Sequence, residues 1–299
     1  MSCTASPSVK QVYGAARVLR VWELPRSSFY HRRRQDQQPA RTIERRGPKT
    51  PYSDAELTEK IRAVLAESPF HGEGYRKVWA RLRYQQQVRT SKGRVLRLMR
   101  KAQLLAPSRR PVWVEPNAHT GTIVTERPNQ MWGTDATATE TLEQGQVTIF
   151  VAVDHCTAEC VGIHAAKPAT RFEALEPIRQ GVRAMFGGFA AGVAAGLRVR
   201  HDHGSQYMSD AFQSEIRFLG IASSPAFVRQ PEGNGCVERF MRTLKEQLLW
   251  LRSFRNVEEL HEALLLFKKR YNEHWLIERN EFRSPRQARQ DLLAIGAAA

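Results

Sequence analysis

Between positions 53 and 101, apolar residues recur with helical spacing. Ser53 and Glu56 stand three positions apart, as in a capping box, where each side chain bonds the other residue's backbone amide. The repeat predicts one helix from Ser53, a second over about 73–84, and a third that begins after position 90 or 91. The residues expected to face inward are Leu57, Ile61, Val64, Leu65, Tyr75, Val78, Trp79, Leu82, Val95, Leu96 and Met99.

The third of these helices is basic on its other face. The positively charged residues there are Arg94, Arg97, Arg100 and Lys101. Three short helices, the last with a basic outer face, predict a helix-turn-helix domain over 51–106 whose third helix enters the major groove of DNA. A three-helix bundle with a charged exterior is the alternative.

The first fifty residues have a weaker pattern. Residues 8–22 predict a helix, Pro25 interrupts it, and a short basic segment with aromatic residues follows. The stretch 35–51 is polar and contains proline and glycine, which is typical of a linker. We therefore expect 1–50 to be a basic helical segment with a linker.

A second linker, rich in proline and polar residues, covers 107–129, and beyond it the pattern becomes strand-like. Short runs with β-branched residues predict an antiparallel meander, after which helices and strands alternate. An α/β or α+β domain over 130–290, with helices on its sheet and a tail at 291–299, is the expectation. Its predicted strands are 130–139, 146–156, 159–166, 197–202 and 221–223, and its first helices are 170–185 and 209–219.

The net charge of +16 is concentrated in the first two-fifths of the chain. Residues 1–120 hold 25 lysines and arginines against 9 acids, whereas residues 121–299 hold 21 of each. Basic side chains clustered on helix faces indicate a polyanionic partner, because neutralising phosphates releases their counterions. A solvated basic surface that only aids solubility is the alternative.

The four cysteines form no CxxC pair, which fits a reducing compartment. Cys156 and Cys160 lie near His155, so a zinc site is conceivable, but their apolar surroundings favour structural cysteines. The longest weakly polar tract, 186–197, is too short to span a bilayer, and the N-terminus has no apolar signal core. We therefore expect a soluble cytoplasmic protein.

Three acids occupy places that such a fold would bring together. Asp135 lies in the first predicted strand, Asp202 ends the fourth, and Glu238 stands in the first turns of the long final helix. Sixty-six residues separate the first pair and 35 the second. Asp154, which ends a neighbouring strand, is either a fourth acid of the site or a turn residue.

The segments around these acids, "WGTD", "DHGSQY" and "PEGNGCVERFMRTLKE", resemble the Asp-Asp-(35)-Glu core of transposases and retroviral-type integrases. With "SPFHGEGYRKVWARLR" and "RVLRLMRKAQLLA" before it, nearly the whole chain is similar to the OrfB type of the IS-three group of insertion-sequence transposases. The resemblance implies a ribonuclease H-like core, a mixed five-stranded sheet flanked by helices. It also implies that Asp135, Asp202 and Glu238 hold two divalent cations, Mg²⁺ or Mn²⁺. After Tyr271-Asn272 the group's C-terminal pattern is lost.

The resemblance further implies a DDE transposase that binds element ends, cleaves one strand and joins the freed 3′-hydroxyl to another phosphodiester. The implied partners are terminal inverted repeats, target DNA, further copies of the chain and the product of an upstream OrfA frame; no membrane partner is expected. The implied location is the nucleoid. A stand-alone nuclease of the ribonuclease H superfamily and an inactive DNA-binding regulator are the alternatives.

Carboxylates suit this chemistry for a reason independent of the resemblance. Mg²⁺ prefers oxygen ligands, and two such cations can activate an oxygen nucleophile and stabilise a leaving oxyanion. On the helix of Glu238, Arg242 and Lys245 share its face and are expected to contact the DNA backbone. Asn234 precedes that helix and is expected near the substrate. His201 and His203, on either side of Asp202, are expected to pack or to face solvent, and a phosphate contact is the alternative.

Overall fold

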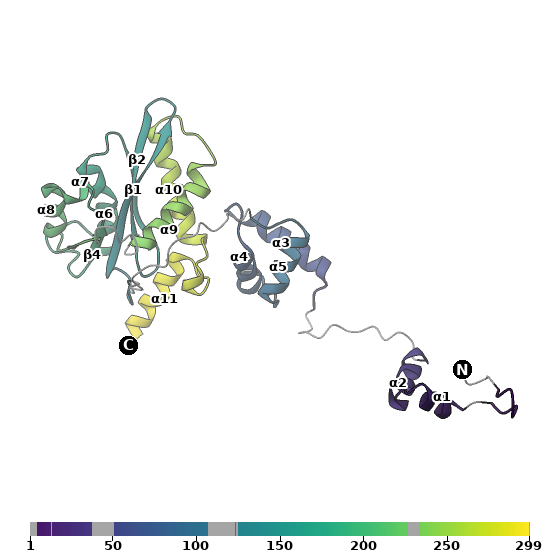
Figure 1. Cartoon of the computed structure of the whole chain (residues 1–299). Helices are drawn as coiled ribbons and strands as arrows, with labels where there is room; N and C mark the ends of the chain where they lie inside the picture. The colour runs from purple at the N-terminus through teal and green to yellow at the C-terminus, as the bar shows by residue number, and fades with distance from the viewer. Residues whose placement is uncertain are drawn as a thin grey trace. The chain divides into compact units, whose positions relative to one another are not determined.

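The computed structural model describes residues 5–12, 14–37, 51–106, 123, 125–226 and 234–298, with side chains to 296. It divides into two compact units, Met1–Pro51 and Tyr52–Ala299 (Figure 1). Among the described residues, no helix combines the length and the apolar composition that crossing a membrane requires.

The first unit contains two helices, α1 (Ala15–Val21) and α2 (Arg26–Gln37). The expectation that a helix covers 8–22 is wrong at its start. Lys10 has a positive φ of 48°, and Ala5 bridges Val12 in antiparallel fashion, so the chain turns back before Gly14. The basic segment after Pro25 is helical, and none of its residues is buried within the unit.

The second unit begins with three helices packed around one apolar cluster. They are α3 (Asp54–Glu67), α4 (Tyr75–Ala80), which continues as a π-helical turn (Arg81–Gln85), and α5 (Lys92–Lys101). The capping box of Ser53 and Glu56 is present. On α5 the buried residues are Val95, Leu98 and Met99, whereas Leu96 is only half-buried, so Leu98 takes the place expected for Leu96 on the inward face. Tyr75 and Trp79 are likewise partly buried at the edge of the cluster.

A buried ion pair connects this helical region to the rest of the unit. The guanidinium of Arg81 donates to both carboxylate oxygens of Glu73, at 2.7 and 2.9 Å, and also to the carbonyl of His274 at 3.2 Å. The Glu73 side chain is fully buried and that of Arg81 is 6% exposed. Phe70 packs edge-on against Trp275 beside them, with ring centroids 4.8 Å apart. The helix-turn-helix region and the C-terminal helices therefore share charged and apolar contacts.

The sheet has five strands in the order β3-β2-β1-β4-β5. β1, β2 and β3 pair in antiparallel fashion, whereas β4 is parallel to both β1 and β5. This is the mixed sheet of a ribonuclease H-like core, and it confirms the fold expected from the resemblance. The strands are β1 (Met131–Thr141), β2 (Gly145–Asp154), β3 (Cys160–Ala166), β4 (Arg198–His201) and β5 (Ala222–Pro225).

Helices cover both faces of the sheet (Figure 1). Along β2, the side chains of Phe150 and Ala152 lie in the apolar cluster on one face of the sheet. Those of Ile149 and Val151 lie in the apolar cluster on the opposite face. β2 is thus buried on both faces, as its unbroken apolar run indicates. The first face is covered by α6 (Arg171–Phe186), α7 (Ser205–Met208) and α8 (Asp210–Phe218); the second by α9 (Gly235–Leu244), its π-helical continuation (Lys245–Leu249) and α10 (Val257–His274).

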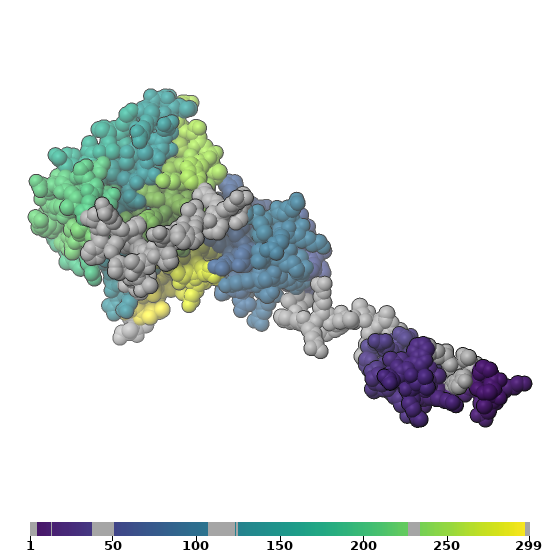
Figure 2. Space-filling model, viewed as in Figure 1, coloured from purple at the N-terminus to yellow at the C-terminus, as the bar shows by residue number. Residues whose placement is uncertain are grey.

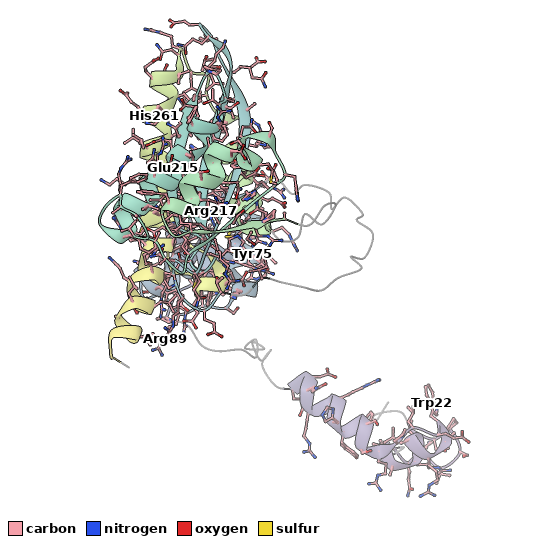
Figure 3. All side chains as sticks on the ribbon, turned by 90° about the vertical axis from the view of Figure 1, so that its left-hand side faces the viewer. Trp22, Tyr75, Arg89, Glu215, Arg217 and His261 are labelled. Atoms are coloured by element: carbon pink, nitrogen blue, oxygen red, sulfur yellow. The ribbon has the colours of Figure 1, made fainter. Side chains whose placement is uncertain are left out.

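The two helical layers are held in different ways. On the first face, Glu215 of α8, which is labelled in Figure 3, forms two ion-pair contacts with Arg179 of α6, both at 2.5 Å. On the second face, α9 and α10 pack mainly through apolar side chains, and Figure 2 shows their atoms beside those of the sheet. The chain ends with a 3₁₀ turn (Glu278–Asn280) and α11 (Pro285–Ala298).

Replacing Glu73 with alanine should destabilise the second unit strongly, by about 3–5 kcal/mol, because it leaves the guanidinium of Arg81 buried without its counter-ion. Urea unfolding followed by circular dichroism measures this loss. Glu59→Ala, which breaks an exposed pair with Arg62, is the matched control and should cost less than about 1 kcal/mol. Equal losses in the two variants would contradict the assigned role of the buried pair.

Candidate active site

Strand register places Asp135 and Asp202 side by side. β1 and β4 run parallel, and Gly133 pairs with Arg200. Two residues further along each strand lie Asp135 and Asp202, so continuing the register brings the acids level. Because side chains two positions apart share a face of the sheet, both acids lie on the face that Gly133 presents to α9.

Glu238 reaches this position because the first turn of α9 lies directly on the backbone of β1. A Cβ atom at Gly133 would stand 2.4 Å from Cγ2 of Val237 and 2.6 Å from Oδ1 of Asn234. Such distances are closer than van der Waals contact allows, so only glycine permits the approach. Glu238 follows Val237 in the chain, so the first turn of α9 brings it near Asp135, and its charge acts on the pKa of that carboxyl.

The electrostatics of Asp135 show that the acids share one field. Burial raises the pKa of this half-buried carboxyl, and the negative charges of Asp202 and Glu238 raise it further. A hydrogen bond from the Ala136 amide, at 2.8 Å, and the charge of Lys245 lower the pKa and offset part of this rise. Asp202 and Glu238 themselves are exposed to solvent. The carboxylates of Asp202 and Glu238 and the ammonium group of Lys245 are therefore near enough to Asp135 to act on its pKa.

The two histidines beside Asp202 have separate surroundings. His201 is buried on the opposite face of the sheet, stacked on Tyr207 and hydrogen-bonded to the Ser223 hydroxyl at 2.9 Å. This is a packing role. His203 is exposed. The carboxylate of Asp202 accepts a hydrogen bond from the Gly204 amide at 2.8 Å, and this bond fixes the turn after β4.

Two residues near the acids were not singled out from the sequence. Tyr207 is buried next to Thr134, and burial raises the pKa of its phenol, with smaller contributions from Asp135 and Asp202. The hydroxyl of Thr134 donates to the Val151 carbonyl at 2.8 Å. Tyr207 belongs to the quoted "DHGSQY" segment, and that position was the available signal for it.

Asn234 is placed differently from the expectation that it contacts DNA. Its side chain is buried, and its amide nitrogen donates to the Thr134 carbonyl at 3.2 Å. The amide thus joins α9 to β1 inside the fold. Arg242 is exposed and forms an ion pair with Glu246 at 3.0 Å. Lys245 is half-buried, and its charge lowers the pKa of Asp135.

The basic face of α5 is partly engaged within the protein. Arg94 and Arg97 each bond the carboxylate of Asp54, at 2.9 and 2.8 Å, and Arg94 also donates to the Tyr52 carbonyl. Arg94 is therefore a link between α5 and the start of α3. Arg97, Arg100 and Lys101 are exposed.

The other candidates for metal binding have structural roles. Asp154 is fully buried and accepts hydrogen bonds from Asn129 and Thr157, so it is a turn residue. Cys160 is buried in β3, and burial raises its pKa to about 12. Within the described ranges, no three His, Cys, Asp or Glu side chains stand close enough to hold a metal ion. This applies to the cysteine region and equally to the three acids, whose side chains would have to move inward to share one.

Known protein families match this chain in two regions. The model of an HTH-like domain matches residues 52–112, and two models of an integrase core domain match residues 125–231 and 219–276. The InsD transposases of the insertion elements IS2A/D/F/H/I/K and IS2-9 from Escherichia coli are each 28% identical over 201 residues. The match covers 66% of this chain and 65% or 64% of those relatives, so the chain spans about two thirds of their length.

Solved structures of viral integrases are also similar. The catalytic core domain of HTLV-2 integrase in complex with magnesium aligns with a TM-score of 0.41 and 18% identity, covering 55% of this chain and 97% of that one. The simian T-cell lymphotropic virus intasome in complex with PP2A regulatory subunit B56 gamma aligns with a TM-score of 0.46 and 17% identity, covering 79% and 74%. The chain thus contains an HTH-like domain followed by an integrase core domain and is similar to the InsD transposases, an order of domains that fits the resemblance to the OrfB type of the IS-three group.

Proposed function

We propose that this protein is a DDE transposase, which binds the ends of a mobile DNA element, cleaves a strand and transfers the freed end to another phosphodiester. The observation that carries the proposal is that Asp135 lies level with Asp202 in the strand register and that Glu238, on α9, is near enough for its charge to raise the pKa of Asp135. The family of the two domains supports it.

Asp135, Asp202 and Glu238 would hold Mg²⁺ or Mn²⁺ at two adjacent positions. Carboxylate oxygens are the ligands that such hard cations prefer. Burial, and to a smaller extent the negative charges of Asp202 and Glu238, raise the pKa of Asp135, and a bound cation would favour its ionised form, relieve the repulsion and draw the side chains together. When bound, such cations activate an oxygen nucleophile and stabilise the leaving oxyanion.

The chain's own residues would position the substrate for this chemistry. Lys245, one positive charge beside three negative ones, would hold a DNA phosphate close to Asp135. Arg242, exposed on the preceding turn, would bind the backbone further along by exchanging Glu246 for phosphate. Water placed at the acids gives a nick, whereas a 3′-hydroxyl in the same place gives joining, so one site serves both steps.

The basic face of α5 would bind the duplex of the element end. Arg97, Arg100 and Lys101 supply exposed charge there, while Asp54 orients Arg97 and Arg94. We propose terminal inverted repeats and target DNA as substrates, two or more copies of the chain on paired ends, and an OrfA product as a further partner. The site of action would be the nucleoid.

Asp135→Asn, Asp202→Asn and Glu238→Gln should each lower strand cleavage and joining at least about 10³-fold, because metal ions supply several kcal/mol of transition-state stabilisation. DNA affinity should stay nearly unchanged. Labelled terminal repeats incubated with Mn²⁺ measure both activities, and Glu246→Gln, a nearby acid paired with Arg242, is the control that keeps activity.

The products distinguish the proposed function from its alternatives. Joined DNA from the wild-type chain supports the transposase. Nicking without joining supports a stand-alone nuclease, and binding alone supports a regulator. An acid whose variant retained wild-type rates would not belong to the site.

Asp135→Asn should also raise the melting temperature of the metal-free protein at pH 7. The pKa of Asp135 is higher in the folded state than in the unfolded one, so its ionised form opposes folding above that pKa, and asparagine removes the opposition. The gain should disappear as the pH falls through the folded-state pKa and wild-type Asp135 becomes neutral. Thermal melts in a chelator across pH 4–8 test this, and a lower melting temperature for the variant at pH 7 would contradict it.

Arg97→Ala with Arg100→Ala should weaken binding to element ends and lower the slope of log affinity against log salt by up to about 1.8, or about 0.9 per lost phosphate contact. Fluorescence anisotropy at several salt concentrations measures the slope. Arg62→Ala, at an exposed position of α3, is the control and should leave it unchanged. An unaltered slope in the double variant would mean that Arg97 and Arg100 of α5 do not contact the DNA.

A further inference from the structure

Two buried polar atoms without hydrogen-bond partners meet above Gly133. They are Nε2 of His155 and Oδ1 of Asn234. A Cβ atom at Gly133 would stand 2.8 Å from the first and 2.6 Å from the second. Two atoms this close to one point are within reach of a direct hydrogen bond after a small side-chain rotation, or of one bridging water. Buried polar groups in folded proteins are nearly always paired, so this coincidence calls for a cause.

The two atoms are chemically complementary. The Asn234 amide nitrogen donates to the Thr134 carbonyl, which fixes the orientation of the amide and leaves Oδ1 as an acceptor. Burial lowers the pKa of His155 to about 4, so its ring is neutral and carries a single N–H. If that proton is on Nε2, the histidine presents a donor to the acceptor of Asn234.

The pair would join a rigid part of the sheet to the helix of Glu238. His155 directly follows β2; its amide donates to the Met131 carbonyl at 2.9 Å, and its own carbonyl accepts Arg279 at 2.8 Å. Asn234 is the N-cap of α9, one helical turn before Glu238. A hydrogen bond between them therefore fixes where the first turn of α9 begins.

We propose that the Nε2–H group of His155 donates a hydrogen bond toward Oδ1 of Asn234, directly or through one water, and that His155 is a positioning residue for Glu238. This rests on the proposed function in so far as Glu238 holds a cation. His155 acts through Asn234 and α9 and contacts neither substrate nor cation. Second-sphere groups of this kind commonly change metal affinity or activity 10–100-fold.

Arg200 is the competing partner for the acceptor. It pairs with Gly133 across the β1–β4 ladder, and its Nε is also buried without a partner. Its charge contributes to lowering the pKa of His155, so the two side chains are near one another. If Arg200 bonded Oδ1 instead, Asn234 would be coupled to Arg200 and not to His155.

The first experiment compares two replacements of the histidine in the full chain. His155→Phe keeps an aromatic ring but has no donor, whereas His155→Gln has less ring-like shape but places an amide donor near the position of Nε2. If the pair exists, His155→Phe should lower the cleavage rate about tenfold or more and raise the Mn²⁺ concentration needed for half-maximal rate. His155→Gln should keep both quantities close to their wild-type values. DNA affinity should not change. A role in packing alone predicts the opposite order, and that order would overturn the proposal.

A double-mutant cycle then tests the partner. His155→Phe combined with Asn234→Ala should be no slower than the slower single variant, because each removes the same bond. Multiplying effects, or coupling of Asn234→Ala to Arg200→Gln in place of His155→Phe, would overturn the pair. Thermal melts of every variant establish that the compared proteins are folded.

Imidazole ¹⁵N NMR gives a readout that does not require activity. Wild-type protein should show the Nε2–H tautomer at His155, and Asn234→Ala should shift that signal while exposed His203 stays unchanged. An Nδ1–H tautomer in the wild type would overturn the pair even in an active enzyme. If the wild type cleaves no DNA but shows the expected signal, the proposed function fails and the pair stands.

Discussion

Direct contact between the first turn of α9 and the backbone of β1 at Gly133 is the constraint on which the site depends. Glu238 comes from a separate element, with 35 residues between it and Asp202 in the chain, and α9 can lie this close to β1 because β1 has no side chain at Gly133. The other face shows the same device: a Cβ at Gly162 would stand 1.9 Å from the Pro177 carbonyl oxygen of α6. On each face of the sheet, a glycine without a side chain lets a helix pack directly on the strand backbone.

This close packing holds together groups that repel one another. Burial, together with the charges of Asp202 and Glu238, makes the ionised carboxylate of Asp135 unfavourable for folding, and the Ala136 amide and the charge of Lys245 offset only part of that cost. The surrounding apolar clusters on both faces of the sheet supply the stability that tolerates it. Functional sites are the usual place for such local conflict in an otherwise consistent structure.

Much of this arrangement could be predicted from sequence, because strands, helices and the order of the acids follow from periodicity and spacing. The exceptions are side chains whose position depends on a distant partner. Arg81 looks like a surface residue until Glu73 is placed beside it. From sequence alone, Arg94 and Asn234 look like residues that contact DNA. In the structure Arg94 donates a hydrogen bond to Asp54, and Asn234 donates one to the Thr134 carbonyl. Hydrophobic periodicity assigns polar residues to the exterior and carries no information about such pairs.

The parallel ladder between β1 and β4 consists of only three residue pairs, against ten between β1 and β2. It joins segments with 66 residues between Asp135 and Asp202. Closing this ladder therefore has a larger entropic cost than closing the hairpin of β1 and β2. Fraying of this ladder would separate Asp135 from Asp202 and leave the meander of β1, β2 and β3 folded. Secondary-structure content and an assembled reactive centre are therefore separate properties of this molecule, and the second is the more easily lost.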